Sequence, residues 1–199
     1  MSTPPAGRTA RSRDEILQAA VDLCAERGYA AVTMEAVATR AKVGKPTVYR
    51  WWPSKGALFL DALMDRLGER FFLYPDTGDI DADLRTWLRT LAEVFADERH
   101  GQIISGVIGS AQLDAELAAM IQGKVHTALA AINRARLVKA QEAGQLAAGD
   151  PALYDDMLVA PLWYRLLVTG EPITSDYTDT IVNTLISPAP GQAPAAEER

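Results

Sequence analysis

The sequence is poor in cysteine and histidine, the residues on which thiol chemistry and most zinc sites depend. Its 199 residues include one cysteine, Cys24, and two histidines, His100 and His126. A single cysteine cannot form an internal disulfide, and these three residues do not have a metal-binding spacing. We therefore expect a reducing compartment, no metal and no cofactor.

Long apolar runs and strand-like alternation are also missing. No stretch approaches eighteen uninterrupted apolar residues, so the sequence predicts no membrane span. Residues 1–13 carry charge but no apolar segment, which argues against a secretion signal. The hydrophobic content of 48% is nevertheless enough for a sizeable core. Because the apolar residues recur with a period of about 3.6, we expect an all-α protein. The lack of a signal or a membrane span leads us to expect it in the cytoplasm.

Charge is distributed unevenly along the chain. The formal net charge of the whole is -6, but residues 1–56 contain nine Lys or Arg and five Asp or Glu, a net charge of +4. The remaining residues therefore carry -10. A basic amino-terminal segment joined to an acidic larger part suggests that only the first part meets a polyanion such as DNA.

Cap and breaker residues divide the helical pattern. Thr33 and Ser54 are good N-caps, Gly28 is a typical helix stop, and Pro53 ends the helix before it. Gly44 lies in a tight turn, where it is available for an unusual backbone angle. The expected helices cover residues 13–27, 33–41, 45–52, 54–72, 80–97, 102–112, 114–143, 151–168 and 175–186.

The two short helices over residues 33–41 and 45–52 have the dimensions of a helix-turn-helix DNA reader. With Val43, Val48 and Trp52 facing inward, the second helix presents mixed side chains outward: Lys45, Thr47, Tyr49, Arg50 and Trp51. Helix pairs with a glycine turn also occur in proteins that bind nothing charged. A helical protein-interaction module without specific DNA binding is therefore the alternative. It would show no salt-dependent binding to DNA at all.

The string TMEAVATRAKVGKPTVYRWWPSKGALFLDAL, residues 33–63, closely resembles the DNA-binding segment of the TetR family of bacterial transcription regulators. The resemblance spans about residues 11–67. It is specific because the turn, the Thr-Val-Tyr trio and the Pro-Ser-Lys after the aromatic pair keep their spacing. It implies a phosphate contact from Thr33, major-groove contacts from Lys45, Thr47 and Tyr49, and backbone contacts from Trp51 and Lys55.

Three positions depart from the family pattern. The family often has Ser at the position of Gly44, where the hydroxyl would cap the recognition helix. The position of Trp51 is often His, and that of Gly56 is often acidic. These departures concern local contacts and leave the implied fold unchanged.

Residues 74–79 are turn formers that break the helical pattern, so we place the transition between two domains there. The expected parts are a disordered arm over residues 1–10, a helix-turn-helix domain over 11–56 with the helix 54–72 as connector, a helical effector-binding and dimerisation domain over 73–186, and a disordered tail over 187–199.

In the second domain the segment PLWYRLLVTG, residues 161–170, is similar to the penultimate helix of many relatives, in which the last two helices form a homodimer. The apolar faces of residues 151–168 and 175–186 supply the candidate interface, and packing within one chain is the alternative. The candidates are Leu158, Leu162, Arg165, Leu166, Tyr177, Ile181 and Leu185.

By the same resemblance a small-molecule effector binds between helices of the acidic domain, and the residues there suit a largely apolar one. Packing in the core is the alternative for each candidate. His126 or Asn133 would serve as a polar anchor. The candidate lining residues are Trp87, Leu91, Ile104, Val107, Ile108, Met120, His126 and Trp163.

The sequence thus predicts a homodimeric transcriptional regulator, most readily a repressor released by its effector from a palindromic operator in double-stranded DNA. An enzyme that uses Cys24 or His126 is disfavoured, because neither residue has a partner at a catalytic spacing.

Overall fold

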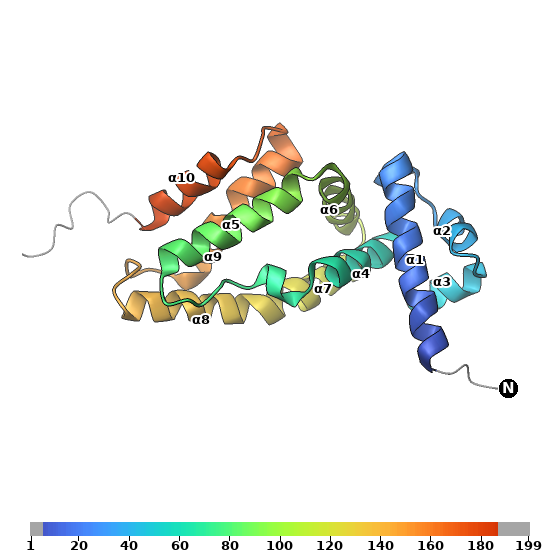
Figure 1. Ribbon diagram of the computed structural model, residues 1–199, viewed down its shortest axis with the longest axis horizontal. Helices are drawn as coiled ribbons and strands as arrows, with labels where there is room; N and C mark the ends of the chain where they lie inside the picture. The colour runs from blue at the N-terminus through green and yellow to red at the C-terminus, as the bar shows by residue number, and fades with distance from the viewer. Residues whose placement is uncertain (1–5, 187–199) are drawn as a thin grey trace, which may run out of the picture. The chain divides into compact units, whose positions relative to one another are not determined.

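The computed structural model describes the backbone of residues 6–186 and the side chains of residues 11–186 other than 69, 70, 126 and 128. This part of the chain is helical and contains no strand, which confirms the expected all-α class (Figure 1). The α-helices are α1 (Ala6–Arg27), α2 (Met34–Arg40), α3 (Lys45–Trp51), α4 (Lys55–Leu67), α5 (Ile80–Ala96), α6 (Glu98–Ala111), α7 (Ala115–Ile121), α8 (Ala128–Glu142), α9 (Pro151–Tyr164) and α10 (Ser175–Ile186). Short 3-10 turns, η1 (Tyr29–Ala31) and η2 (Glu69–Phe72), and π-helical turns, η3 (Gln122–Thr127) and η4 (Arg165–Thr169), lie between them.

The helices pack as two compact units. Of the described residues, the amino-terminal unit contains 6–72 and 93–129, and the carboxyl-terminal unit contains 73–92 and 130–186. In this division α6 and α7 belong to the amino-terminal unit because they pack against α1 and α4, and the domain boundary expected near residue 73 stays a prediction. In the described residues, no helix is long and apolar enough to cross a membrane.

Helix α1 begins at Ala6, seven residues before the expected start at Arg13. Residues 6–10, expected in a disordered arm, are therefore helical. An established helix extends at little cost through good helix formers such as Ala and Arg, and this needs no apolar face. Residues 1–5 and the expected tail, residues 187–199, lie outside the described part of the chain.

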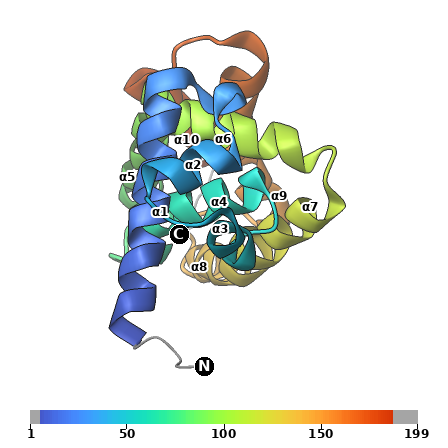
Figure 2. The same ribbon diagram turned by 90° about the vertical axis from the view of Figure 1, so that its right-hand side faces the viewer.

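The amino-terminal unit is held by an apolar core between α1 and α4, with α2 packed against α1 and α3 packed against α2 (Figure 2). Cys24 is buried in this core, as expected. The predicted caps are confirmed: Thr33 Oγ1 accepts a hydrogen bond from the Ala36 amide at 3.1 Å, and Ser54 Oγ accepts one from Ala57 at 3.2 Å. Helix α4 ends at Leu67, earlier than expected, because Gly68 has a φ of 69°.

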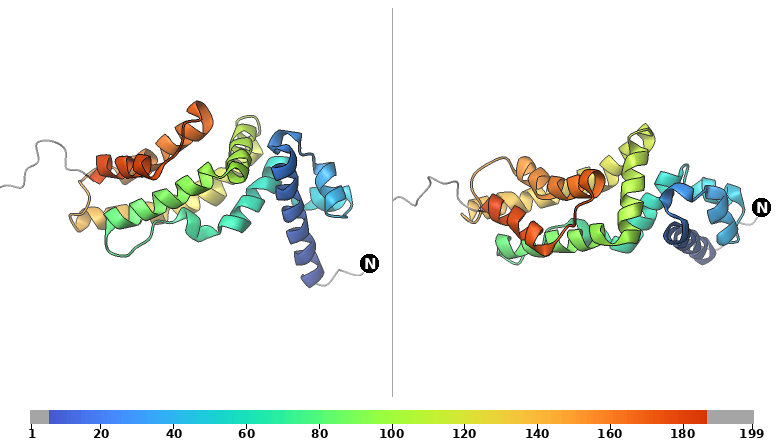
Figure 3. Two further views of the ribbon diagram at one scale, coloured as in Figure 1. Left: turned by 45° about the horizontal axis from the view of Figure 1, so that its top comes forward. Right: turned by 90° about the horizontal axis from the view of Figure 1, so that it is seen from above.

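In the carboxyl-terminal unit, α9 packs against α10 (Figure 3), and a buried ion pair joins α5 to α8. Arg136 donates to Asp83 at 2.7 Å, and both side chains are almost fully buried. Asp83 also accepts from the Thr77 hydroxyl at 2.7 Å and the Thr77 amide at 3.1 Å. The carboxylate of Asp83 therefore fixes the loop before α5 as well as α8.

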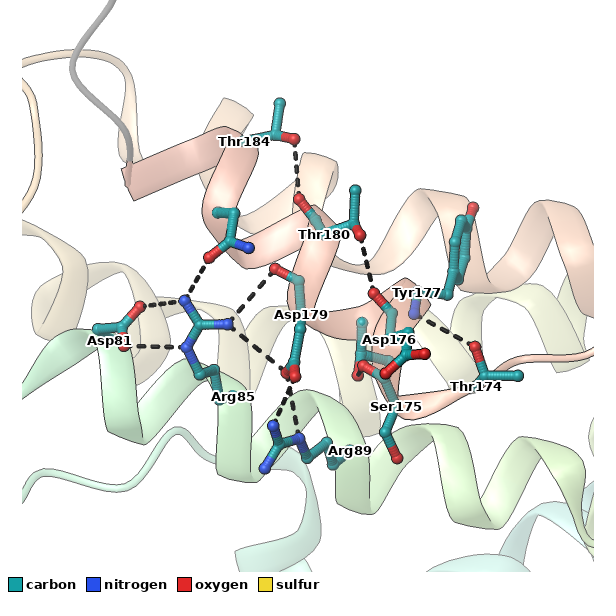
Figure 4. Close-up of polar contacts among 12 residues, drawn as sticks. Asp81, Arg85, Arg89, Thr174, Ser175, Asp176, Tyr177, Asp179, Thr180 and Thr184 are labelled. Carbon is teal, nitrogen blue, oxygen red and sulfur yellow. Dashed lines mark hydrogen bonds and ion pairs between the residues drawn. The ribbon is translucent and has the colours of Figure 1, made fainter.

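Arginine side chains fasten α10 to α5 at the surface of the carboxyl-terminal unit (Figure 4). Arg89 donates twice to Asp179, at 2.6 and 3.1 Å, and Arg85 contacts both Asp179 and Asn183. Arg85 is itself held by Asp81 at 2.7 and 2.9 Å. Hydrogen bonding from Arg89 lowers the pKa of Asp179, so this carboxylate stays charged and the attachment persists at neutral pH.

Replacement of Asp83 by Ala is expected to lower the free energy of unfolding by about 3 kcal/mol. The buried Arg136 would keep only the half-exposed Asp76 as an ionic partner, and the Thr77 amide and hydroxyl would lose their acceptor. Urea unfolding followed by circular dichroism measures the change. Asp81→Ala is the matched control, since it removes a surface pair from the same helix and should cost less than about 1 kcal/mol. Equal losses in the two variants would contradict a special role for the buried pair.

Candidate nucleic-acid interface

Helices α2 and α3 pack against each other through apolar side chains on their inner faces. Val37 of α2 and Val48 of α3 are both fully buried, as expected for Val48. Trp52, which follows α3, is 2% exposed, and its Nε1 donates to Asp61 of α4 at 3.0 Å. These contacts fix which face of α3 points outward.

The turn between the two helices differs from the expectation in one detail. Gly44 has a φ of -70° and is the N-cap of α3, without a side-chain cap bond. The left-handed residue is instead Lys42, with a φ of 55°. A glycine in a turn signals conformational freedom, but sequence alone does not say which turn residue adopts the unusual angle.

The outward face of α3 carries a cation and two aromatic rings. Lys45, Tyr49 and Trp51 are exposed, with Tyr49 at 41% and Trp51 at 39%, whereas Thr47 is half-buried. The Lys45 ammonium lies 5.5 Å from the centre of the Tyr49 ring. A cation and aromatic side chains together on one exposed face offer ionic, hydrogen-bonding and stacking contacts to phosphates, sugars and base edges.

Lys45 also makes a close ion pair with Glu35 of α2, which the sequence did not reveal. The hydrogen bond lowers the pKa of Glu35 and raises that of Lys45, so both groups are charged at neutral pH. The two residues are ten positions apart in sequence. Only the turn geometry brings them together, so no helical spacing could have indicated the pair.

Thr33 stands at the start of α2 with an exposed side chain. Its oxygen accepts the cap bond from Ala36, which leaves the hydroxyl hydrogen to donate elsewhere. This geometry suits a contact with a phosphate oxygen.

Lys55, for which the resemblance implies a contact with the DNA backbone, contacts the backbone of the protein in this structure. Its Nζ donates to the carbonyl oxygens of Tyr29 at 3.0 Å and Ala30 at 3.4 Å, and it lies 4.3 Å from the centre of the Tyr29 ring. Burial lowers the pKa of Lys55. The ammonium group is thus engaged within the protein.

The candidate effector residues fall in both compact units. Trp87 and Leu91 are buried in the carboxyl-terminal unit, where Trp87 packs edge-on against Tyr74 at 4.6 Å. In the amino-terminal unit Ile104 and Val107 are buried, and two others, Ile108 and Met120, are half-buried.

The remaining effector candidates lie on α9, η3 and α8. Trp163 of α9 is half-buried, and the side chain of His126, in η3, lies outside the described part. Asn133, the other suggested polar anchor, is buried, and its Oδ1 accepts from the Tyr74 amide at 3.0 Å. The lining therefore stays a prediction. Among the described residues, no three His, Cys, Asp or Glu side chains gather to hold a metal ion.

Four of the seven candidate interface residues are buried within the single chain, and the role of the seven in a dimer stays a prediction. Leu158 and Leu162 of α9 are fully buried, and Ile181 and Leu185 of α10 are nearly so. Arg165 stacks on the Tyr177 ring at 3.4 Å, and Leu166 is half-buried. These residues hold α9 and α10 together within one chain.

A different set of apolar side chains on the same segment is exposed. They recur at spacings of three, four and seven, which places them along one side of α9 and η4. Because α9 is apolar nearly all round, its sequence pattern could not indicate which side packs within the chain. We call this surface the α9 face; it consists of Leu153, Met157, Tyr164, Leu167 and Val168.

Comparisons with known proteins agree on one family. Residues 16–62 match "Bacterial regulatory proteins, tetR family", and residues 74–185 match "Tetracyclin repressor-like, C-terminal domain". The chain is 35% identical over 178 residues to the HTH-type transcriptional regulator YdeS of Bacillus subtilis, covering 86% of this chain and 89% of that one.

Two solved structures share the fold. The TetR family transcription regulator SCO0332 is 36% identical, with a TM-score of 0.70 over 87% of this chain and 95% of the other. RolR, solved in complex with resorcinol, is 17% identical, with a TM-score of 0.65 over 91% and 90% of the two chains.

Replacement of Thr33 by Ala is expected to lower the free energy of unfolding by about 1 kcal/mol, because the start of α2 loses its cap. Thr39→Ala is the control on the same helix: its hydroxyl donates only to the Glu35 carbonyl, and Ala has the higher helix propensity. Urea unfolding should therefore find Thr39→Ala near neutral. A neutral Thr33→Ala would contradict the capping role.

Proposed function

The chain belongs to the TetR family of bacterial regulatory proteins and is a DNA-binding transcriptional regulator, not an enzyme. From this premise we propose that it is a homodimeric repressor, acting in the cytoplasm, that binds a palindromic operator and leaves it when a small, largely apolar effector binds. The observation that carries the proposal is the outward face of α3, with Lys45, Tyr49 and Trp51 exposed above a buried inner face.

In this proposal α3 enters the major groove. Lys45 exchanges Glu35 for a phosphate or a base edge, and Tyr49 and Thr47 contact base edges. Thr33 and Trp51 meet the sugar-phosphate backbone. The cost of separating Lys45 from Glu35 is small because both groups are exposed and solvated.

A second copy of the chain supplies the other recognition helix. A single α3 offers too few contacts for a specific site, and two related helices read half-sites about 34 Å apart. The α9 face supports this arrangement, since exposed apolar side chains in a row suit a self-complementary interface between two copies. The dimer thus rests on residues adjacent to those that the sequence suggested.

The effector part of the proposal rests on the family to which the chain belongs. The fold is able to hold an aromatic ligand, as the RolR complex with resorcinol illustrates. An effector that binds better to a conformer with wrongly spaced recognition helices releases DNA, by no more than its differential affinity for that conformer.

Selection of bound sequences from a random duplex library tests operator recognition, and we expect a palindrome. On that selected operator, Lys45→Ala and Tyr49→Ala should each weaken binding at least about tenfold, the loss of one good base or phosphate contact. Fluorescence anisotropy measures the affinity, and circular dichroism should show unchanged helical content.

Lys139→Ala is the control for Lys45→Ala. It removes a lysine of equal charge, which lies on α8 and pairs with Asp76. The operator affinity of this variant should match that of the parent. Parental affinity in both α3 variants would refute the assignment of α3. A parent that binds no DNA would favour the protein-interaction module.

Met157→Lys is expected to convert the dimer into a monomer, because it puts a charge in the middle of the α9 face. Light scattering coupled to size exclusion measures the mass. Leu113→Lys is the control, since Leu113 is 94% exposed, lies in the turn after α6 and is not part of the α9 face, so its variant should stay dimeric. A dimeric Met157→Lys protein would move the interface elsewhere.

A further inference from the structure

The turn between α1 and α2, which contains η1, packs against α6, a helix far along the chain. The Tyr29 ring lies directly against Gly106, where a Cβ atom would come within 2.2 Å of the ring. One helical turn on, Ser110 Oγ lies 3.0 Å from the Tyr29 hydroxyl. Tyr29 therefore occupies a notch in α6 that exists because residue 106 has no side chain.

The hydrogen bond between Tyr29 and Ser110 has a definite direction. Ser110 donates its single hydroxyl hydrogen to the Gly106 carbonyl at 2.8 Å, so its oxygen must accept from Tyr29. Burial raises the pKa of Tyr29, which keeps the phenol protonated and able to donate. The contact is thus specific in both shape and hydrogen bonding.

Lys55 holds the same turn from α4. Its ammonium donates to the carbonyl oxygens of Tyr29 and Ala30 and lies over the Tyr29 ring, a cation-π geometry. The Phe59 ring, also on α4, packs against Tyr29 with 5.0 Å between centroids. Side chains from α4 and the notch of α6 therefore meet at one residue of η1.

The turn η1 leads directly into the start of α2, which contacts DNA in the proposed function. Between η1 and Thr33 stands only Val32, which is itself buried. The position of the turn consequently sets the position of the Thr33 hydroxyl and of the first residues of α2.

We propose that Tyr29 and Lys55 are positioning residues for DNA binding: they hold η1 in the notch of α6 so that Thr33 and α2 meet the DNA backbone. The proposal rests on the proposed function. In it Lys55 makes no phosphate contact, and a displacement of α6 reaches the DNA-binding helices through Tyr29 as well as through α4.

Two glycine substitutions on α6 test the notch. Gly106→Ala drives a methyl group into the Tyr29 ring, whereas Gly109→Ala, three residues later, meets no atom within 4 Å. Overpacking of this kind is relieved by displacing η1. On the operator selected as above, Gly106→Ala should therefore bind about tenfold more weakly than Gly109→Ala, the order of one lost DNA contact. Tyr29→Phe, which loses only the bond to Ser110, should bind more weakly than the parent and serves if Gly106→Ala does not fold.

A salt titration separates positioning from phosphate binding. The logarithm of DNA affinity falls linearly with the logarithm of salt concentration, and removing a lysine that contacts phosphate makes this negative slope shallower by about one. Lys55→Met should weaken operator binding with an unchanged slope, because Thr33 and α2 are misplaced but no counterion release is lost. Lys45→Met is the comparison: it removes an exposed α3 lysine of equal charge and should make the slope shallower if Lys45 contacts phosphate.

Thermal unfolding of each variant establishes that it is folded under the binding conditions. The proposal is overturned if folded Gly106→Ala binds like Gly109→Ala, if Tyr29→Phe binds like the parent, or if Lys55→Met makes the salt slope shallower by about one. A parental protein that binds no duplex would instead defeat the proposed function, an outcome distinct from all three.

Discussion

The outward face of α3 depends on the burial of its inner face. A helix of seven residues is too short to be stable by itself in water, so its orientation is set by packing rather than by its own hydrogen bonds. Val48 and Trp52 provide that packing, and the Trp52 indole is further fixed by Asp61. Asp61 also pairs with Lys124 at 2.8 Å, so the support of α3 extends to the segment after α7. The DNA-facing side chains are exposed because these inner residues leave α3 one way to lie.

The sequence allowed the prediction of features that depend on neighbours along the chain. The caps at Thr33 and Ser54 and the burial of Val48 follow from local chemistry and helical period, and all three were correctly predicted. The family resemblance added the function. Spacing could not reveal contacts between distant segments, such as the carbonyl partners of Lys55 or the attachment of α6 and α7 to the amino-terminal unit. It also failed on α9, where apolar residues on every side hide which of them pack within the chain.

Different kinds of interaction stabilise the interior of each unit. In the amino-terminal unit the contacts that position η1 and α3 are mainly shape and aromatic packing, which salt screens weakly. In the carboxyl-terminal unit α10 is fastened to α5 by partly exposed arginine-carboxylate pairs, which salt and acid both weaken. Since the pKa of Asp179 is lowered in the folded protein, its contribution to stability is complete above the ordinary carboxyl range and is lost as the pH falls through the lowered value.

The notch at Gly106 also constrains how this protein evolves. Any side chain at position 106 collides with the aromatic ring at position 29, so the two positions cannot change in arbitrary order. A lineage that shortens residue 29 first passes through a cavity, which costs stability but keeps the fold, whereas one that enlarges residue 106 first passes through a clash. Related sequences should therefore show covariation between these positions, with alanine or larger residues at 106 accompanied by a smaller residue at 29.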